Sequence, residues 1–200
     1  EFKKGNVLRT VDPSMTMLAK ATLNEEFPES FCIYDLSQFL SVYALNKDAE
    51  LSFDDINVIF TSNKSKIRYR KTSKNMIVTT DKDIPVNSIV SSVSISEETF
   101  QNVLRTASVL KSSHIAFESD GDKISITCYC AKDDSAHTNT IEVGESNGVK
   151  FKSVYLTEQM RMVVGPYDID IMEKITHFKH GTQEIEYWIA NQVKESNFGE

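Results

Sequence analysis

A strand, a helix-capping residue, a short helix and a second strand follow one another three times in this chain. The first copy, Phe31–Phe53, reads FCIYDLSQFLSVYALNKDAELSF; the second is Ser92–Phe117 and the third is Phe151–Ile171. In the first copy Asp35 is the expected N-cap, and Gln38, three residues later, completes a capping box. Three such units at irregular separations predict an internally duplicated α+β fold and exclude a solenoid.

The helices of these units are expected to be amphipathic. In the first copy an apolar stripe recurs at helical spacing and is predicted to be buried; it consists of Leu36, Phe39, Leu40 and Tyr43. The helix of the second copy, about residues 97–111, has an apolar face made of Phe100, Val103, Leu104, Ala107 and Leu110. The third copy starts a short helix at its Thr157 cap, and Gly165–Pro166 ends it.

Short apolar or alternating runs predict strands in the rest of the chain. The expected strands are 4–11, 15–23, 57–61, 66–70, 113–118, 123–130, 138–144, 149–156, 167–176 and 184–193, with a turn at 177–181. Residues 73–91 have few apolar side chains at their centre, so we interpret them as a connector. The predicted domains are 1–86, which includes most of this connector, and 87–200.

A run of basic residues precedes the connector. Within it Lys66, Arg68 and Arg70 share one face of a strand, while Ile67 and Tyr69 share the other. One interpretation is a half-buried outer strand with a solvated basic face, which is the more common case. The other is a strand that contacts phosphates.

Composition and motifs exclude several classes of function. No run of 18 apolar residues is present, so no membrane span is expected. The three cysteines are an odd number and favour reduced thiols. Cys128 and Cys130 with His177 and His180 do not match the usual zinc-ligand spacing. Because catalytic and phosphate-binding motifs are also missing, the sequence predicts no enzyme, no metal and no cofactor.

Isolated basic residues lie on the helices, away from their apolar stripes. Arg105 and Arg161 belong to the second and third helices, and Lys47 and Lys111 lie at or just beyond helix ends. The net charge of −7 opposes nucleic-acid binding by the whole surface, but it leaves room for a basic groove on an acidic body. We therefore predict that these four residues contact the phosphates of a DNA duplex.

Three segments taken in order carry a resemblance to a known family. IYDLSQFLSVYALNKDAELS, DIPVNSIVSSVSISEETFQNVLR and LTEQMRMVVGPYDIDI resemble the DNA polymerase sliding clamps of tailed bacteriophages, and the resemblance extends over nearly the whole chain. It implies a duplicated, PCNA-like DNA-clamp fold in which antiparallel sheets lie outside and short helices line a ring of three subunits. The family begins with a strand and a basic helix without a counterpart here, so we expect the N-terminal domain to lack them.

The resemblance also implies a function and partners. Such a clamp encircles double-stranded DNA independently of sequence and tethers the C-terminal peptide of the replicative DNA polymerase during viral DNA replication. An ATP-dependent clamp loader opens the ring, and in phages of this kind the clamp can also activate late transcription. The implied location is the cytoplasm of the infected bacterial host, without a membrane partner. The competing class is a phage single-stranded-DNA-binding or structural protein, although the aromatic residues here occupy core-periodic positions.

The resemblance places the polymerase peptide in a pocket between the two domains, under the connector. The apolar residues offered by the first helix end, the connector and the last strand are Val42, Leu45, Ile84, Pro85, Val86, Tyr187 and Ile189. An exposed apolar patch of this kind usually marks an interaction site. The alternative is that these residues close the two domain cores.

Overall fold

The computed structural model describes residues 1–133 and 135–199, which divide into two compact units. Unit 1 consists of Glu1–Val11 and Thr22–Asp81, and unit 2 of Asp12–Ala21 and Lys82–Glu200. Strand β2 (Met17–Phe27) passes from unit 2 into unit 1. Residues 12–21 belong to unit 2 of the structure, whereas the sequence analysis assigned them to the predicted domain 1–86 and not to 87–200. The predicted domain boundary stays a prediction. Within the described residues no helix is long and apolar enough to cross a membrane.

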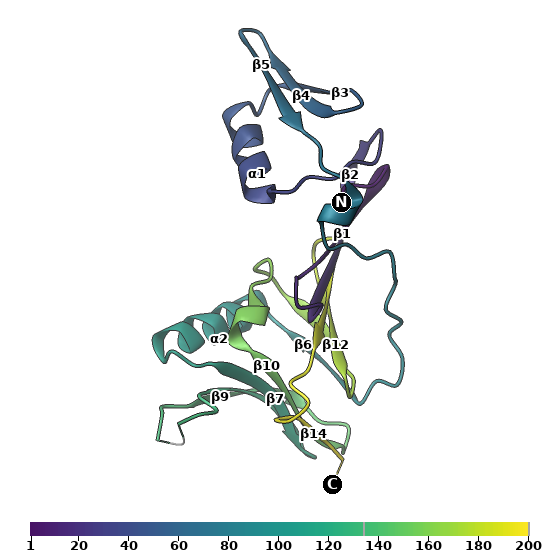
Figure 1. Cartoon of the computed structure of the whole chain (residues 1–200). Helices are drawn as coiled ribbons and strands as arrows, with labels where there is room; N and C mark the ends of the chain where they lie inside the picture. Colours follow the sequence, from purple (N-terminus) through teal and green to yellow (C-terminus); the bar gives the residue numbers. More distant parts are fainter. Residues whose placement is uncertain (134, 200) are drawn as a thin grey trace. The chain divides into compact units, whose positions relative to one another are not determined.

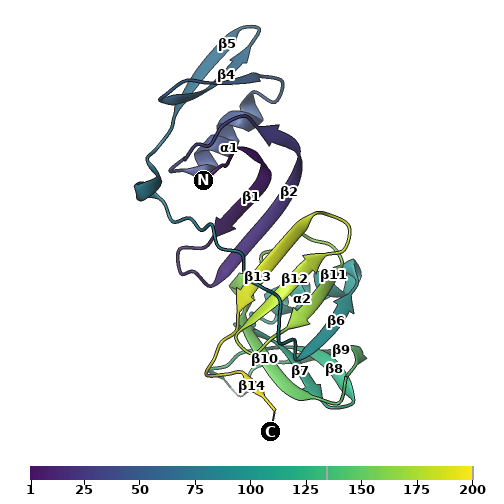
Figure 2. The same cartoon turned by 90° about the vertical axis from the view of Figure 1, so that its right-hand side faces the viewer.

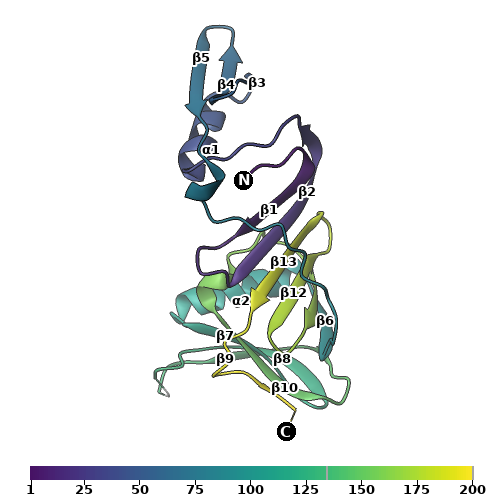
Figure 3. The ribbon, with the colours of Figure 1, turned by 45° about the vertical axis from the view of Figure 1, so that its right-hand side comes forward.

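Unit 1 combines a hairpin, one helix and a three-stranded sheet (Figures 1 and 3). Strand β1 (Gly5–Val11) lies beside β2, and helix α1 (Leu36–Leu45) follows. The antiparallel sheet is β3 (Glu50–Phe53), β4 (Asn57–Ser62) and β5 (Ser65–Arg70), and a single 3-10 turn, η1 (Lys74–Met76), comes after it. The Asp35 cap is confirmed, because its carboxylate accepts the Gln38 N–H at 2.8 Å.

The core of unit 1 is largely aromatic. Phe39 of α1 contacts Phe60 and Tyr69 of the sheet, at centroid distances of 5.6 and 5.2 Å. The prediction of a fully buried stripe on α1 was wrong, because only Phe39 is buried. The side chains of Leu36, Leu40 and Tyr43 remain 51%, 52% and 45% exposed. The core contacts the side of α1 between Phe39 and the half-buried Val42, and Leu36, Leu40 and Tyr43 lie roughly 70–130° around the helix from the middle of that side.

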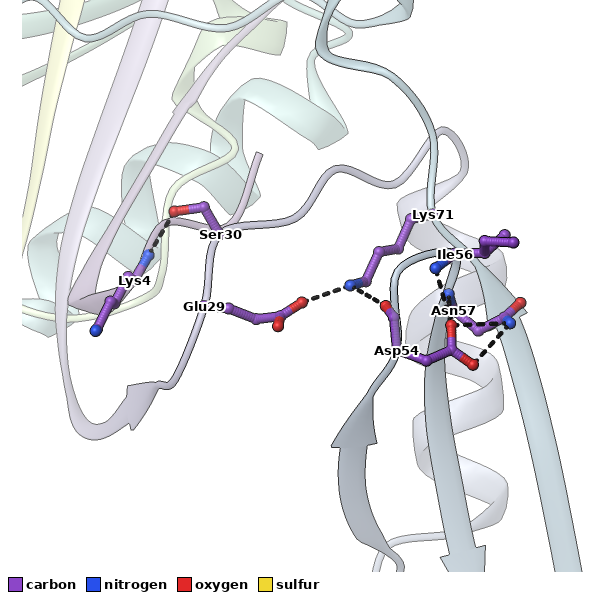
Figure 4. Close-up of polar contacts among 7 residues, drawn as sticks. All are labelled: Lys4, Glu29, Ser30, Asp54, Ile56, Asn57 and Lys71. Atoms are coloured by element: carbon purple, nitrogen blue, oxygen red, sulfur yellow. Dashed lines mark hydrogen bonds and ion pairs between the residues drawn. The ribbon is translucent and has the colours of Figure 1, made fainter.

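Lys71 ties three segments of unit 1 together (Figure 4). Its ammonium forms an ion pair with Glu29, from the segment before α1, and donates to the backbone carbonyl of Asp54 at 2.7 Å. The Asp54 carboxylate in turn accepts the N–H groups of Ile56 and Asn57 at 2.8 and 2.6 Å. Hydrogen bonds from Asn57 lower the pKa of Asp54, so the β3–β4 turn keeps its acceptor ionised.

Lys71→Met is expected to destabilise unit 1. The side chain of Lys71 is only 14% exposed, and its loss leaves the Glu29 carboxylate and the Asp54 carbonyl without their donor. Charge-assisted hydrogen bonds of this kind contribute about 1.5–3 kcal/mol. Urea unfolding monitored by circular dichroism measures the change. A matched exposed substitution, Lys64→Met, is expected to change the unfolding free energy by less than about 0.5 kcal/mol; equal values for the two variants would contradict the structural role of Lys71.

Unit 2 contains two antiparallel sheets that enclose one core. The first sheet has the order β14 (Asn197–Phe198), β10 (Lys150–Leu156), β7 (His114–Asp120), β8 (Lys123–Tyr129) and β9 (Asn139–Glu145). The second has the order β13 (Ile185–Ala190), β12 (Ile175–His180), β11 (Tyr167–Ile171) and β6 (Ser91–Ile95), and residues Met17–Ala21 of β2 pair with β13 (Figure 2). Helix α2 (Glu97–Val109) and the 3-10 turn η2 (Thr157–Met160) complete the unit.

Three sequence predictions for secondary structure were wrong. The third helix is only the single turn η2, because the β-branched Val163 and Val164 and then Gly165–Pro166 do not continue a helix. The predicted strand 167–176 is two strands, β11 and β12, and the predicted turn 177–181 falls largely within β12. The side-chain amide of Asn191 donates to the carbonyls of Met172 and Glu173, which fixes the turn between these strands.

The first strand of the first repeat is also weaker than expected. Residues 31–34 form isolated bridges at Phe31 and Cys32 rather than a strand.

The thiols of Cys32 and Cys128 are buried and that of Cys130 is half-buried, and all three are free. Burial raises the pKa of Cys128 to about 11, so this thiol is a poor nucleophile at neutral pH.

A buried polar network crosses the core of unit 2. The Tyr155 hydroxyl, on β10, lies 2.6 Å from Ser153 Oγ and contacts Thr176 Oγ1 on β12. The Thr176 hydroxyl in turn donates to the side-chain amide oxygen of Asn191 at 3.3 Å. Burial raises the pKa of Tyr155 to about 12, which keeps the phenol protonated at physiological pH. The network therefore joins the two sheets without burying a charge.

Candidate functional site

Helix α2 places Arg105 on the side away from the core of unit 2. The helix begins at the Ser96 cap, whose Oγ accepts the Thr99 N–H at 3.1 Å, and it buries Phe100, Val103 and Ala107. Arg105 is exposed on the opposite face and has no ion-pair partner among the described residues. An exposed, unpaired guanidinium on a regular helix is suited to contact a phosphate.

Lys111 follows α2 in an unusual backbone conformation. Its φ of 53° lies in the left-handed region, where glycine is the usual residue. The Ser112 N–H donates to the Ala107 carbonyl at 2.8 Å, and the Lys111 N–H donates to the Ser108 carbonyl at 3.2 Å, which together form a Schellman motif. The exposed Lys111 side chain therefore leaves the helix end at a position fixed by the backbone.

Arg161 is exposed but does not lie on a helix, in contrast to the sequence prediction. It is the residue after η2, between the buried Met160 and Met162. The turn η2 lies next to α2 (Figure 1), and the Thr157 N–H donates to the carbonyl of Ser113, in the segment after α2, at 3.0 Å. Arg105, Lys111 and Arg161 thus belong to neighbouring elements of unit 2, although the exposed Glu158 on η2 makes this surface less uniformly basic than predicted.

Lys47 belongs to unit 1. It is exposed two residues after the end of α1, where Asn46 caps the helix by donating its N–H to the Tyr43 carbonyl at 3.0 Å. Each predicted DNA-contacting residue is therefore exposed, and their contact with DNA stays a prediction.

The predicted partner residues fall in different environments. Val42 is half-buried and Leu45 is 80% exposed, both in unit 1; in unit 2, Ile84 is half-buried, and Pro85 and Val86 are exposed. Tyr187 and Ile189 pack into the core of unit 2, and Ile189 has no exposed surface. Their role in binding a peptide stays a prediction.

The opposite face of β13 presents a residue that the sequence analysis did not select. Alternation along the strand puts Trp188 on the side away from Tyr187 and Ile189. Directly opposite Trp188 are Leu18 of β2 and His177 of β12, and the indole stacks on the imidazole at 4.8 Å. We call Leu18, His177 and Trp188 the Trp188 row. The connector residues from Lys82 onward pass on this side of the sheet, away from α2 (Figures 1 and 2).

Polar contacts hold the Trp188 row in place. His177 Nε2 lies 2.9 Å from the Glu186 carboxylate, and His177 Nδ1 lies 3.6 Å from Asp170. The Trp188 indole N–H is buried and has no hydrogen-bond partner in the described chain. A buried donor without a partner costs free energy, and a carbonyl group that reached it would remove that cost.

Two curated relatives resemble the chain over almost its full length. The sliding clamp of Escherichia phage RB69 is 31% identical over 203 residues, which covers 96% of this chain and 88% of the relative. The sliding clamp of Vibrio phage KVP40 is 26% identical over 197 residues, covering 94% and 88%. No family model matches the chain.

Solved structures share the fold at low sequence identity. A PCNA from Thermococcus kodakaraensis has a TM-score of 0.64 at 18% identity, covering 96% of this chain and 92% of that one. The Archaeoglobus fulgidus PCNA bound to the C-terminal region of FEN-1 gives 0.64 at 16%, covering 96% and 87%. The Helicobacter pylori beta clamp gives 0.72 at 11%, covering 95% and 57%.

Antiparallel sheets with short helices, matched along the chain to PCNA and the beta clamp, define the DNA-clamp fold. The 31% identity to the RB69 protein then makes the family explicit: this chain belongs to the bacteriophage sliding clamps. Sliding clamps are processivity factors of DNA replication and are not enzymes, which agrees with the lack of a catalytic motif in the sequence.

Proposed function

We propose that this clamp encircles duplex DNA and tethers the replicative DNA polymerase of its phage in the cytoplasm of the infected bacterium. The observation that carries the proposal is the set of exposed basic residues on and beside α2 and η2, namely Arg105, Lys111 and Arg161, with Lys47 after α1. Lys and Arg contacts with phosphates give affinity without sequence preference, and many weak contacts of this kind allow sliding.

The ring is proposed to be a homotrimer closed head to tail. Two strand edges support this arrangement, because β5 is the edge of its sheet in unit 1 and β9 is the edge of its sheet in unit 2. Strand β5 carries exposed Lys66, Arg68 and Arg70, whereas β9 carries exposed Glu142 and Glu145. Edges of opposite charge on two copies are complementary, and repetition of one such contact closes a ring.

A peptide partner and a loader complete the proposal. The C-terminal peptide of the polymerase is proposed to dock beside the connector, where Pro85 and Val86 are exposed, on the side of the sheet that carries the Trp188 row. The A. fulgidus PCNA, whose fold this chain shares, holds a C-terminal region of FEN-1, and this supports a peptide mode of binding. A ring of this kind needs an ATP-dependent loader to open it around DNA, and the same peptide site would serve a late-transcription factor.

The DNA role is tested by charge reversal. Arg105→Glu with Arg161→Glu is expected to impair processive synthesis on a primed circular template while the native mass of the assembly stays the same. Each lost phosphate contact lowers the slope of log affinity against log salt by about one. A matched reversal of Lys174 and Lys194, which are exposed elsewhere in unit 2, controls for net charge. Unchanged processivity in the Arg105/Arg161 variant would contradict the assignment.

A further inference from the structure

The backbone around Arg161 is fixed more firmly than its place in a short loop suggests. Arg161 has φ −77° and ψ 60°, the conformation of an inverse γ-turn. Its neighbours Met160 and Met162 are 2% and 7% exposed and belong to the core of unit 2. The two methionines anchor the chain on both sides and leave the guanidinium outside.

Two tyrosine hydroxyls hold the backbone of the next residue, Val163. The Val163 N–H donates to Tyr187 Oη at 3.1 Å, and Tyr167 Oη donates to the Val163 carbonyl. Burial raises the pKa of Tyr167 above its ordinary value, with a smaller contribution from the neighbouring Tyr187, so its hydroxyl remains a donor. Both hydrogen-bonding groups of one exposed loop residue are therefore held by side chains that reach out of the core.

His180 holds the far end of the same loop. Its Nδ1 accepts the N–H groups of Thr182 and Gln183, both at 3.2 Å, so the ring hydrogen lies on Nε2, which faces the Val164 carbonyl at 3.5 Å. A Cβ atom on Gly165 would lie 2.1 Å from His180 Nε2, so only glycine fits there. The loop cannot move without breaking these contacts.

We propose that Tyr187 and Tyr167 are positioning residues that aim Arg161 at the DNA backbone; this inference rests on the proposed DNA role of Arg161. With the backbone from Met160 to Gly165 held, the guanidinium moves only through its own side-chain torsions. Less conformational freedom is then lost when it contacts a phosphate. The tyrosines act through Arg161 and do not touch DNA themselves, because both side chains are at most 6% exposed.

Limited trypsin digestion tests whether the loop is held. Trypsin cleaves after Arg161 only when the local chain can open, so the rate of cleavage at Arg161–Met162, followed by mass spectrometry, reports loop order directly. Tyr187→Phe keeps the ring but removes the acceptor of the Val163 N–H, and is expected to raise this rate about fivefold, the factor that corresponds to one lost hydrogen bond. An unchanged cleavage rate would overturn the proposal, regardless of the result for DNA binding.

Tyr155→Phe is the matched control. It also removes a tyrosine hydroxyl from unit 2, but its partners are Ser153 and Thr176 rather than the loop. It is expected to lower the melting temperature without accelerating cleavage at Arg161–Met162. If it accelerates that cleavage as much as Tyr187→Phe does, the effect is global loosening and the positioning role is wrong.

A double-mutant cycle tests the link to DNA. Anisotropy of a short fluorescent duplex is measured for the parent, Tyr187→Phe, Arg161→Gln and the double variant. Arg161→Gln is expected to weaken association about fivefold to tenfold at low salt, and Tyr187→Phe about twofold to threefold. In the Arg161→Gln background Tyr187→Phe should have no further effect.

The outcomes separate the two claims. If Arg161→Gln does not alter association, the proposed DNA role of Arg161 fails, and the digestion still decides whether Tyr187 holds the loop. If Arg161→Gln weakens association but Tyr187→Phe does not, or if their effects simply add, then Tyr187 does not act through Arg161 and the positioning claim fails alone.

Discussion

Replacing Lys66, Arg68 and Arg70 by glutamate is expected to give a folded chain that does not form the proposed trimer. The three side chains are exposed on the face of β5 opposite Ile67 and Tyr69, which pack against the core of unit 1. No ion pair involves them within the described residues, so their reversal breaks no contact that holds the fold. Their proposed partners are the acids on the β9 edge of the next copy.

The acidic residues on the β9 edge keep a net negative charge after their ion pairs within the chain are counted. Glu142 and Glu145 share a single cation, Lys123, at 3.0 and 2.6 Å, so the trio keeps one net negative charge. Opposite charges across paired strands contribute about 0.2–1 kcal/mol each, and reversal replaces attraction by repulsion. Three reversed positions therefore weaken each contact by about 3 kcal/mol, or roughly a hundredfold in the association constant.

Native mass spectrometry and sedimentation measure the assembly. Reversal of Lys4, Lys174 and Lys194, which are exposed outside β5, changes the net charge equally and should leave the trimer intact. Adding Glu142→Lys and Glu145→Lys to the β5 variant should restore assembly, because attraction returns with opposite signs. A β5 variant that remains trimeric would exclude the proposed edge-to-edge contact.

Local sequence signals predicted the elements whose chemistry is local. The Asp35 cap, the basic face of β5 and the apolar face of α2 depend on neighbours a few residues away, and each lies where expected. The three repeats also predicted the fold class correctly, although the third predicted helix is only a single turn in the structure. The resemblance over three segments gave the family.

Side-chain direction in doubly covered strands could not be predicted. In β13 the sequence YWIA is apolar on both faces, so no alternation indicates which side is the core. The register with β2 and β12 decides it, and this register depends on distant residues. The same limit applies to α1, where Leu36 and Leu40 have the spacing of core residues but are half-exposed in this chain.

Trp188→Phe is expected to weaken binding of the polymerase C-terminal peptide while leaving the chain folded. The phenyl ring keeps most of the apolar contact with Leu18 and His177 but lacks the indole N–H, which is buried without a partner. If that N–H serves a peptide carbonyl, its loss lowers affinity about fivefold to tenfold, and Trp188→Ala, which also removes the aromatic anchor, lowers it about a hundredfold.

The two roles of the indole N–H differ in their effect on peptide affinity, and stability of the free chain is measured to exclude a loss of folding. An unsatisfied donor that serves no ligand only costs free energy, so Trp188→Phe would then stabilise the chain and leave peptide affinity unchanged. A donor reserved for a peptide gives lower affinity together with equal or higher stability. Isothermal titration calorimetry with the synthetic peptide and urea unfolding of the same samples separate these cases.

Two further variants locate the peptide along the sheet. Pro85→Glu places a charge on the exposed connector and should weaken the peptide, whereas Val193→Ala, at a side chain 77% exposed beyond β13, should not. Because Trp188 is only 5% exposed, docking on it requires the residues that cover it to move. The connector passes on that side of the sheet, so hydrogen exchange of residues 82–90 is expected to change when the peptide binds (Figures 1 and 2). Peptide affinity that is equal in Trp188→Ala, Pro85→Glu and the parent would place the site elsewhere on the clamp.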